Sequence, residues 1–187
     1  AESRLIPILE SCKPVAKLFP TDRHQKRKTS ILFPHMAMFL AGANLSSLQI
    51  LGLRSCTMSD ADLGFASSLT SLFGVDVGKN QLTTLDPLAG NTGIQLLVAS
   101  ENQLTDISAL AGFTAMDNLL LNSNQLTEVQ PLVDNTGIAG ADSIVLSGNT
   151  LTNDSLCNQI PVIQARITTG TLLVDGACGT VEVLTMN

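Results

Sequence analysis

A four-residue phrase recurs at a fixed interval in this chain, and this repeat constrains the fold more than any other feature. Asn-Gln-Leu-Thr begins at Asn80, Asn102 and Asn124, so both intervals are 22 residues. A related phrase, Asn-Thr-Leu-Thr, begins at Asn149, 25 residues after Asn124. A period of about 20 to 50 residues is the signature of stacked repeats. The chain is therefore predicted to form a solenoid of similar coils.

Apolar residues occupy the same offsets around each recurring Asn. The positions five and three residues before it are apolar and alternate with polar or small residues, which predicts a short strand with one face inward. These pairs are Val75 and Val77, Leu97 and Ala99, Leu119 and Leu121, and Ile144 and Leu146. The residues eight before the Asn are expected in the same core, and they are Leu72, Ile94, Met116 and Ala141. Stacked units of this kind bury a continuous core that one unit alone cannot form.

Each recurring Asn is predicted to turn inward after its strand, where its amide satisfies backbone groups of the turn. An Asn at such a position resembles a ligand or a catalytic amide when it is considered alone. Its repetition at one offset from a strand favours a structural function. We therefore interpret these residues as a structural ladder, made of Asn80, Asn102, Asn124 and Asn149.

The full pattern, Leu-x-x-Leu-x-Leu-x-x-Asn-x-Leu-x-x-Leu-x-x-Leu, is clearest from Leu69 through Leu88. It resembles the leucine-rich repeat of internalins and related bacterial surface proteins, and the segment from Pro131 to Cys178 is similar to the closing part of such secreted proteins. The resemblance covers residues 45–178. It implies an α/β solenoid: a leucine-rich-repeat horseshoe with a curved parallel sheet of about five to six short strands, a mostly irregular convex side and capped ends. Because such repeats accept Cys in place of Asn, it also adds Cys56 to the ladder.

Three segments are expected on this basis: an N-terminal cap or arm (1–44), the repeats (45–152) and a C-terminal cap (153–187). Residues 1–44 match no known pattern. They are expected to form a cap, an arm that adds a strand to the first repeat, or a contact to another subunit. The C-terminal cap is expected to hold a short helix followed by a last strand at Thr171–Val174, and the apolar face of this helix carries Leu156, Ile160 and Ile163.

The four cysteines suggest staples at the two ends of the stack. Cys157 and Cys178 are placed to close the C-terminal cap with a disulfide. Cys12 and Cys56 either form a second bridge or remain two thiols, because Cys56 also occupies a ladder position. Disulfides form in oxidising compartments, so either bridge favours a secreted, periplasmic or cell-surface protein.

Charge is divided unevenly along the chain. Residues 1–28 hold seven basic and three acidic side chains, a net charge of +4, whereas residues 29–187 hold three basic and thirteen acidic side chains, a net charge of −10. An acidic body repels phosphate, which argues against a nucleic-acid partner. No apolar run reaches the roughly 18 to 20 residues that span a bilayer, so no membrane span is expected.

The outward side chains of the strands are predicted to line the concave face of the sheet and to bind a partner. These residues are Arg54, Asp76, Leu96, Val98, Ser100, Asn118, Leu120, Asn122 and Val145. Val98, Leu120 and Val145 form an apolar stripe with no core to fill, which is typical of a partner site. The alternative is that β-branched residues simply favour strands. The partner is expected to be another protein or a second copy of this chain.

Candidates for chemistry are few. The two histidines, His24 and His35, combine with Cys12 at spacings unlike any standard zinc site. No phosphate-binding glycine loop or nucleophile motif is present. We therefore expect no catalytic residue, metal or cofactor, and we predict a protein-binding module rather than an enzyme. The alternative function is a structural subunit that packs into a larger extracellular assembly or filament.

Overall fold

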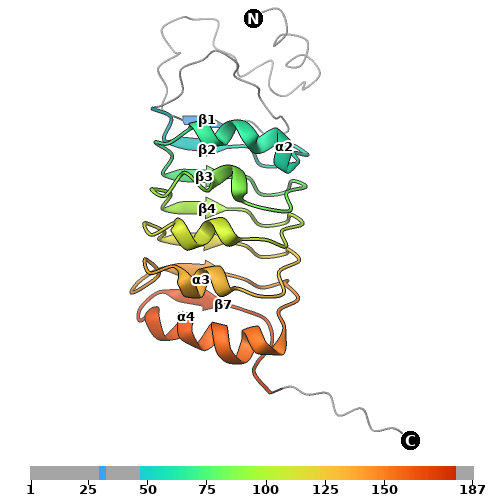
Figure 1. Cartoon of the computed structure of the whole chain (residues 1–187), viewed down its shortest axis with the longest axis vertical. Helices are drawn as coiled ribbons and strands as arrows, with labels where there is room; N and C mark the ends of the chain where they lie inside the picture. Colours follow the sequence, from blue (N-terminus) through green and yellow to red (C-terminus); the bar gives the residue numbers. More distant parts are fainter. Residues whose placement is uncertain (1–29, 33–46, 180–187) are drawn as a thin grey trace, which may run out of the picture.

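The computed structural model describes residues 30–32 and 47–179. They form one stack of coils, and each coil contributes a strand to a parallel sheet of seven strands (Figure 1). The strands lie side by side in chain order, and they are β1 Ser30–Leu32, β2 Ile50–Gly52, β3 Gly74–Asp76, β4 Leu96–Val98, β5 Asn118–Leu120, β6 Ser143–Val145 and β7 Thr171–Leu173. The predicted solenoid with a single parallel sheet is confirmed.

Successive strands pair at the same register, so equivalent residues of neighbouring coils lie next to one another. Leu51 pairs with Val75, and Val75 pairs with Leu97. These central side chains point into the core and are at most 4% exposed. The row ends at Leu172 of β7, which is only half-buried because no described strand follows it. The shared register therefore produces continuous rows of side chains along the stack, although the coils differ in length.

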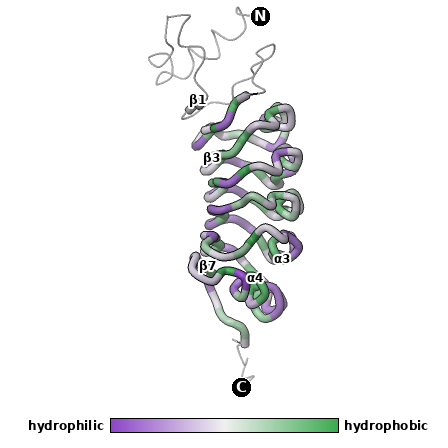
Figure 2. Tube along the Cα trace, turned by 90° about the vertical axis from the view of Figure 1, so that its left-hand side faces the viewer, coloured by the Kyte–Doolittle hydropathy of each residue, from purple (hydrophilic) through white to green (hydrophobic). Residues whose placement is uncertain are grey.

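Short helical segments cover the side of the core opposite the sheet, as Figure 2 shows in side view. They are α2 Asp60–Leu63, η2 Gly64–Ser68, η3 Asp86–Leu88, η4 Ser108–Gly112 and α3 Gln130–Asp134. None exceeds five residues, a length at which a helix is unstable alone. Each segment buries one apolar residue, such as Leu88 in η3 or Leu110 in η4. Packing against the core therefore stabilises these turns within an otherwise irregular convex side.

One inward position on the convex side alternates between an amide and an aromatic ring. It holds Asn91, Phe113 and Asn135 in three successive coils, and each is at most 1% exposed. Asn135 Nδ2 donates to the carbonyl oxygens of Leu110 at 2.7 Å and Phe113 at 3.0 Å. Asn91 Nδ2 donates to Ala66 O at 3.2 Å, while Asn91 Oδ1 has no hydrogen-bond partner among the described residues. Two coils, rather than one, therefore make up the repeating unit at this position.

The recurring Asn residues lie inside the turns that follow the strands, where each amide links two coils. Asn80 Oδ1 accepts hydrogen bonds from the backbone N–H groups of Cys56 at 2.9 Å and Met58 at 3.0 Å. Its Nδ2 donates to the carbonyl oxygens of Leu53 and Val77, at 2.8 Å each. Equivalent bonds to the preceding coil are made by Asn102, Asn124 and Asn149. The ladder amides therefore satisfy buried backbone groups of both the preceding coil and their own coil.

The residue before each ladder position has a left-handed backbone. The φ angles are 59° at Ser55, 56° at Lys79 and Glu101, 58° at Ser123 and 72° at Gly148. A residue other than glycine in this region costs roughly 1–2 kcal/mol. The cost is offset by hydrogen bonds between coils, such as the bond from Lys79 N to Ser100 O at 2.9 Å. The stack therefore imposes the same turn on four different residue types.

The coil that ends at Asn149 is three residues longer than the two before it, and its core differs from the prediction. Ile138 is 1% exposed and fills the position that counting eight residues back assigned to Ala141. Ala141 is exposed instead, so its placement in the core was wrong. The additional residues lie between Ile138 and β6, where Gly140 adopts a φ of 58°. The extra length is therefore accommodated just before the strand.

The C-terminal cap holds a helical segment and the last strand. A π-helical turn, η5 Ser155–Gln159, leads into α4 Ile160–Arg166, and β7 follows. Ile163 is fully buried against the last coil. The predicted disulfide between Cys157 and Cys178 is present, with an S–S distance of 2.06 Å, and it links η5 to the segment after β7.

Arg166 at the end of α4 attaches the cap to the preceding coil. Its Nη1 donates to the carbonyl oxygens of Val133 at 2.7 Å and Asn135 at 3.1 Å. These carbonyls lie at the C-terminal end of α3, where helix carbonyls lack partners within the helix. Arg166 therefore acts as a C-terminal cap for α3 and positions α4 beneath it.

At the other end, β1 pairs with β2 so that Ser30 lies opposite Ile50. Cys12, His24 and His35 lie outside the described residues, so the Cys12–Cys56 bridge stays a prediction. Cys56 is buried, with its Sγ 3.6 Å from Arg54 O. Among residues 30–32 and 47–179, no helix has the length and apolar character needed to cross a membrane.

Candidate protein-binding face

The outward side chains of β4 to β7 form a continuous apolar row across the sheet. The third residues of these strands pair in sequence: Val98 with Leu120, Leu120 with Val145, and Val145 with Leu173. The first three are half-buried by their neighbours in the row, and Leu173 is 50% exposed. We refer to Val98, Leu120, Val145 and Leu173 as the apolar row.

Leu96 and Leu173 show how far the predicted stripe extends. Leu96, at the start of β4, is 41% exposed and widens the apolar row at one end. Leu173 was missed by the sequence analysis, although a strand was predicted at its position. Counting from that strand places Leu173 beside Val145, so the signal was available.

Polar side chains flank the apolar row on both sides. Asn118 at the start of β5 is exposed, and Ser143 at the start of β6 is half-buried. On the other side, beyond the strand ends, Asn122 and Ser147 are half-buried. Ser100 was expected beside them, but it is only 4% exposed and lies outside the accessible face. That expectation was wrong because the coil packing around Ser100 excludes solvent.

The charged residues at the other end of the face bind one another. Arg54 Nη1 lies 3.6 Å from Asp76 Oδ1, and Arg54 Nη2 lies 3.2 Å from Glu101 Oε1. Lys79 Nζ lies 3.2 Å from Glu101 Oε2. The Arg54 guanidinium covers Gly78, where an added Cβ would collide with Nη1. The two positive and two negative charges therefore form one neutral cluster across three coils.

Arg54 and Asp76 bind each other within this cluster, which changes the interpretation of both as partner contacts. Both were predicted as partner contacts, and both are about one-third exposed in the structure. Exposed ion pairs contribute roughly 0–1 kcal/mol each, so the cluster adds little stability. It does neutralise the charges at this end of the face, which leaves the uncharged apolar row as the accessible feature of β4 to β7.

The coils that carry Val98, Leu120 and Val145 contain no positively charged side chain, whereas Arg166 precedes Leu173 in the last coil. Residues 80–165 contain no Lys, Arg or His and eight Asp or Glu residues. Asp117 and Asp142 directly precede β5 and β6, so they lie beside the starts of these strands. Asp117 and Asp142 therefore place negative charge beside the starts of β5 and β6, next to the apolar row.

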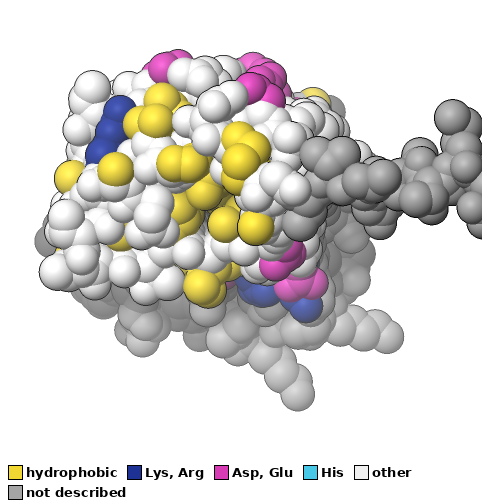
Figure 3. Space-filling view, turned by 90° about the horizontal axis from the view of Figure 1, so that it is seen from below, with side chains coloured by type: hydrophobic (Ala, Val, Ile, Leu, Met, Phe, Trp, Pro, Cys, Tyr) yellow, Lys and Arg dark blue, Asp and Glu magenta, His cyan; other side chains and the backbone are white. Residues whose placement is uncertain are grey.

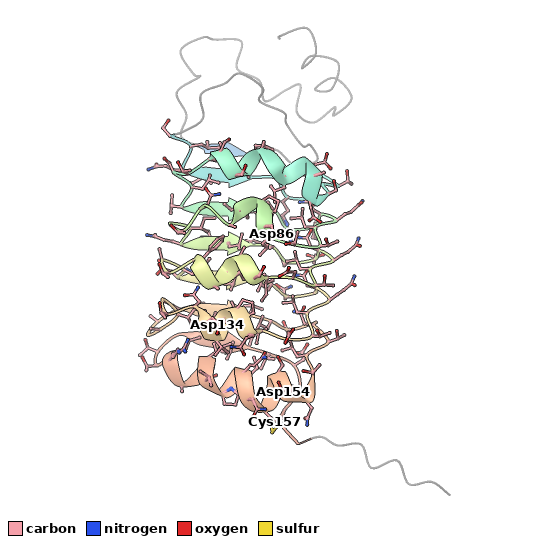
Figure 4. All side chains as sticks on the ribbon, in the orientation of Figure 1. Asp86, Asp134, Asp154 and Cys157 are labelled. Carbon is pink, nitrogen blue, oxygen red and sulfur yellow. A yellow bond between two sulfur atoms is a disulfide. The ribbon has the colours of Figure 1, made fainter. Side chains whose placement is uncertain are left out.

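The acidic side chains of the convex side are spread over the coils instead of gathering at one point. Figure 4 labels Asp86, Asp134 and Asp154 at three different levels of the stack, and Cys157 near its base. Within the described part of the chain, no group of three or more His, Cys, Asp or Glu residues is arranged to hold a metal ion. The acidic residues there behave as a solvated surface.

One acidic group on the convex side has a perturbed ionisation. The pKa of Asp62 in α2 lies below its usual value, first because its carboxylate accepts a hydrogen bond from Ser59 Oγ and second because it accepts one from Ser59 N. These bonds measure 2.7 Å and 2.9 Å. The interaction is a helix cap, and it lies away from the concave face.

The C-terminal end of the stack exposes a second apolar area. Figure 3, which views the molecule from this end, shows hydrophobic side chains spread over the end face with both acidic and basic side chains at its edges. Exposed apolar residues of the last coil are Val162 at 39% and Leu173 at 50%. Leu173 therefore belongs both to the apolar row and to the margin of this end face.

Together, the coil geometry, the Asn ladder and the parallel sheet define a leucine-rich-repeat protein. Comparison with known proteins agrees at the level of structure. No protein-family model and no curated protein sequence matches the chain. Solved structures do match, and several of them are internalins.

The chain is similar to internalin C2 (InlC2) from Listeria monocytogenes, with 26% identity and a TM-score of 0.55 over 70% of this chain and 52% of that chain. It is similar to internalin InlF from the same species, with 25% identity and a TM-score of 0.54 over 72% of this chain and 44% of that chain. The leucine-rich-repeat domain of APL1 shares the fold at 19% identity, with a TM-score of 0.51 over 73% and 40% of the two chains. The chain spans about half the length of the internalins it matches. It is thus an internalin-like leucine-rich-repeat solenoid, a fold that supports a protein-interaction module.

Proposed function

We propose that this chain is a non-catalytic protein-binding module that recognises its partner through the apolar row on the concave face. One observation carries this proposal: Val98, Leu120, Val145 and Leu173 lie in direct register on four neighbouring strands. Inward residues of the same strands already fill the core, so these outward side chains have no structural cavity to occupy. Contiguous apolar surface with a polar border is typical of partner sites.

Selection of peptides from a random library on the immobilised chain tests this site. Binders are then measured against two variants, Val145→Asp in the apolar row and Val162→Asp on the cap helix. The two variants make the same substitution at exposed or half-buried valines on different surfaces. We expect most binders to lose affinity by about tenfold or more on Val145→Asp, as contacts at an interface centre do, and to keep it on Val162→Asp. Binders that retain affinity on Val145→Asp would move the site off the concave face.

The setting that we propose for this module is secreted or on a bacterial cell surface. Two findings support it: the Cys157–Cys178 disulfide, which fits an oxidising compartment, and the similarity to internalins. Mass spectrometry of alkylated protein from culture supernatant and from cells tests this. Disulfide-linked chain should be found in the supernatant or at the surface, and recovery of only reduced chain from the cell interior would contradict the proposal.

The alternative, a structural subunit of an assembly, has a different signature in solution. A subunit of this kind would use the exposed end of the stack and would grow in size with concentration. A binding module is expected to remain a discrete species. Light scattering across a concentration series distinguishes the two, because an open-ended contact produces a continuing increase in mass.

A further inference from the structure

The spacing of the apolar row limits what kind of partner segment can follow it. Neighbouring strands lie about 4.8 Å apart. Because the row takes one residue from each of four paired strands, its side chains repeat at that distance along the stack. The row from Val98 to Leu173 therefore spans roughly 14 Å in three equal steps.

An α-helix matches this spacing better than an extended chain does. A helix with an apolar stripe presents a side chain to the same face about every 5.4 Å. An extended strand presents one about every 6.7 Å, and a polyproline helix about every 9.3 Å. Over three steps the helix departs from the row by about 2 Å, whereas the strand departs by about 6 Å. Flexible side chains accommodate the smaller difference but not the larger one.

The charge around the row determines which residues a partner helix should carry beside its own apolar stripe. Asp117 is exposed, Asp142 Oδ2 accepts a hydrogen bond from Ala139 N at 2.7 Å, and residues 80–165 supply no positive charge to balance these two carboxylates. The positive charges of Arg54 and Lys79 are already paired in the neutral cluster. A partner with Lys or Arg beside its apolar stripe therefore complements this surface, and an acidic partner is repelled.

Hydrogen-bonding groups on both sides of the row fit the same orientation. Asn118 and Ser143 border it on one side, and Asn122 and Ser147 on the other. A helix that lies along the row places its polar flanks above these two borders. A chain that crosses the row would instead place apolar side chains on one of them.

We infer that the apolar row binds a basic amphipathic α-helix of a partner protein, with the helix axis along the stack. This inference rests on the proposed function and specifies the partner class. The helix contributes apolar residues at every turn to Val98, Leu120, Val145 and Leu173, and lysines or arginines on its flanks face Asp117 and Asp142.

Two peptides of identical composition test the inference. Each has about 18 residues of leucine, lysine and glutamine, enough for a helix of about 27 Å. One spaces leucine for a single helix face, and the other alternates leucine and lysine as in a strand. Fluorescence anisotropy of labelled peptide at low concentration gives the affinity of each for the full chain, and circular dichroism reports helix formation on mixing.

We expect the helical isomer to bind about tenfold or more tightly than the strand isomer, with a gain of helix signal. Val145→Asp should abolish this binding and Val162→Asp should leave it intact. Both variants add a negative charge that attracts lysine, so a loss on Val145→Asp reports the lost apolar contact. If the strand isomer binds equally or more tightly and Val145→Asp weakens its binding, the inference of a helical partner is wrong, but the apolar row remains the binding site. If Val145→Asp does not change the binding of either peptide, both the helical partner and the apolar row as its binding site are wrong.

Discussion

The backbone N–H of Leu82 donates to Oδ1 of Asn102, 20 residues further along the chain, at 3.1 Å. Nδ2 of the same amide donates to Val77 O in the preceding coil and to Ala99 O in its own coil. A single side chain thus satisfies backbone groups of two coils in a dry environment. Asn102 therefore holds the distance between coils as well as the shape of its own turn.

Replacement of Asn102 by alanine is expected to destabilise the fold by about 1–3 kcal/mol, because it leaves the buried N–H of Leu82 without its partner and removes one of the two amide donors from the carbonyls of Val77 and Ala99. Urea unfolding followed by circular dichroism measures this loss. Gln103→Ala is the matched control, since Gln103 is exposed and should change stability by less than about 0.5 kcal/mol. Equal effects of the two substitutions would contradict the ladder.

Removal of the disulfide in a Cys157→Ala/Cys178→Ala variant should lower the stability of the cap. The bridge spans 21 residues, and closing a loop of this length contributes about 3 kcal/mol. Hydrogen exchange should show faster exchange in α4 and β7, with β3 to β5 unaffected. Unchanged exchange in the cap would show that Ile163 and Arg166 hold it without the bridge.

Gly148→Ala is expected to destabilise the turn after β6 by about 1–2 kcal/mol, because φ at Gly148 is 72°. A Cβ there would also lie 3.1 Å from Ser123 N of the preceding coil. Gly90→Ala is the control, since a Cβ at Gly90 meets nothing within 4 Å. Thermal unfolding should separate the two variants, and a Gly148→Ala midpoint equal to that of Gly90→Ala would argue against the strained turn.

The lowered pKa of Asp62 predicts how the stability of the first coil changes in acid. Its pKa is lowered in the folded state by the two bonds from Ser59, so its contribution to stability is present above the unfolded pKa. That contribution is lost as pH falls from the ordinary Asp value of 3.8 through the lower pKa of the folded state. Asp62→Asn should be less stable than the parent chain near neutral pH, and the difference should shrink towards the acid end. A stability difference between the two proteins that stays constant as pH falls would show that the helix cap does not depend on the ionisation of Asp62.

The regular coils were predictable because their signal is local and repeated. The strands β2 to β6 and the ladder follow from one offset count around Cys56, Asn80, Asn102, Asn124 and Asn149. The count fails where coil length changes, and Ala141 was misplaced for this reason. The count also could not locate β1. It starts from an Asn or Cys six positions after the first strand residue, and the residue six positions after Ser30 is Met36.

The proposed binding face was harder to predict than the coils, because the exposure and pairing of its side chains depend on neighbours across strands. Ser100 has the same offset as the half-buried Asn122, yet it is buried. Arg54 and Asp76 were identified as charged residues, but their pairing with Glu101, 47 positions from Arg54, depends on side-chain reach. Offsets show which side chains point outward and do not show which of them contact one another.

The alternation of Asn91, Phe113 and Asn135 has a consequence for how chains of this kind lengthen. The sequences around the two amides, Pro87 to Ile94 and Pro131 to Ile138, share Pro-Leu and Asn-Thr-Gly-Ile at a distance of 44 residues. Duplication of a 44-residue block preserves an amide beside a ring at every junction, whereas duplication of a single coil sets two rings or two amides against each other. A pair of coils is therefore the smallest insertion that keeps the alternation of buried amide and ring in this stack.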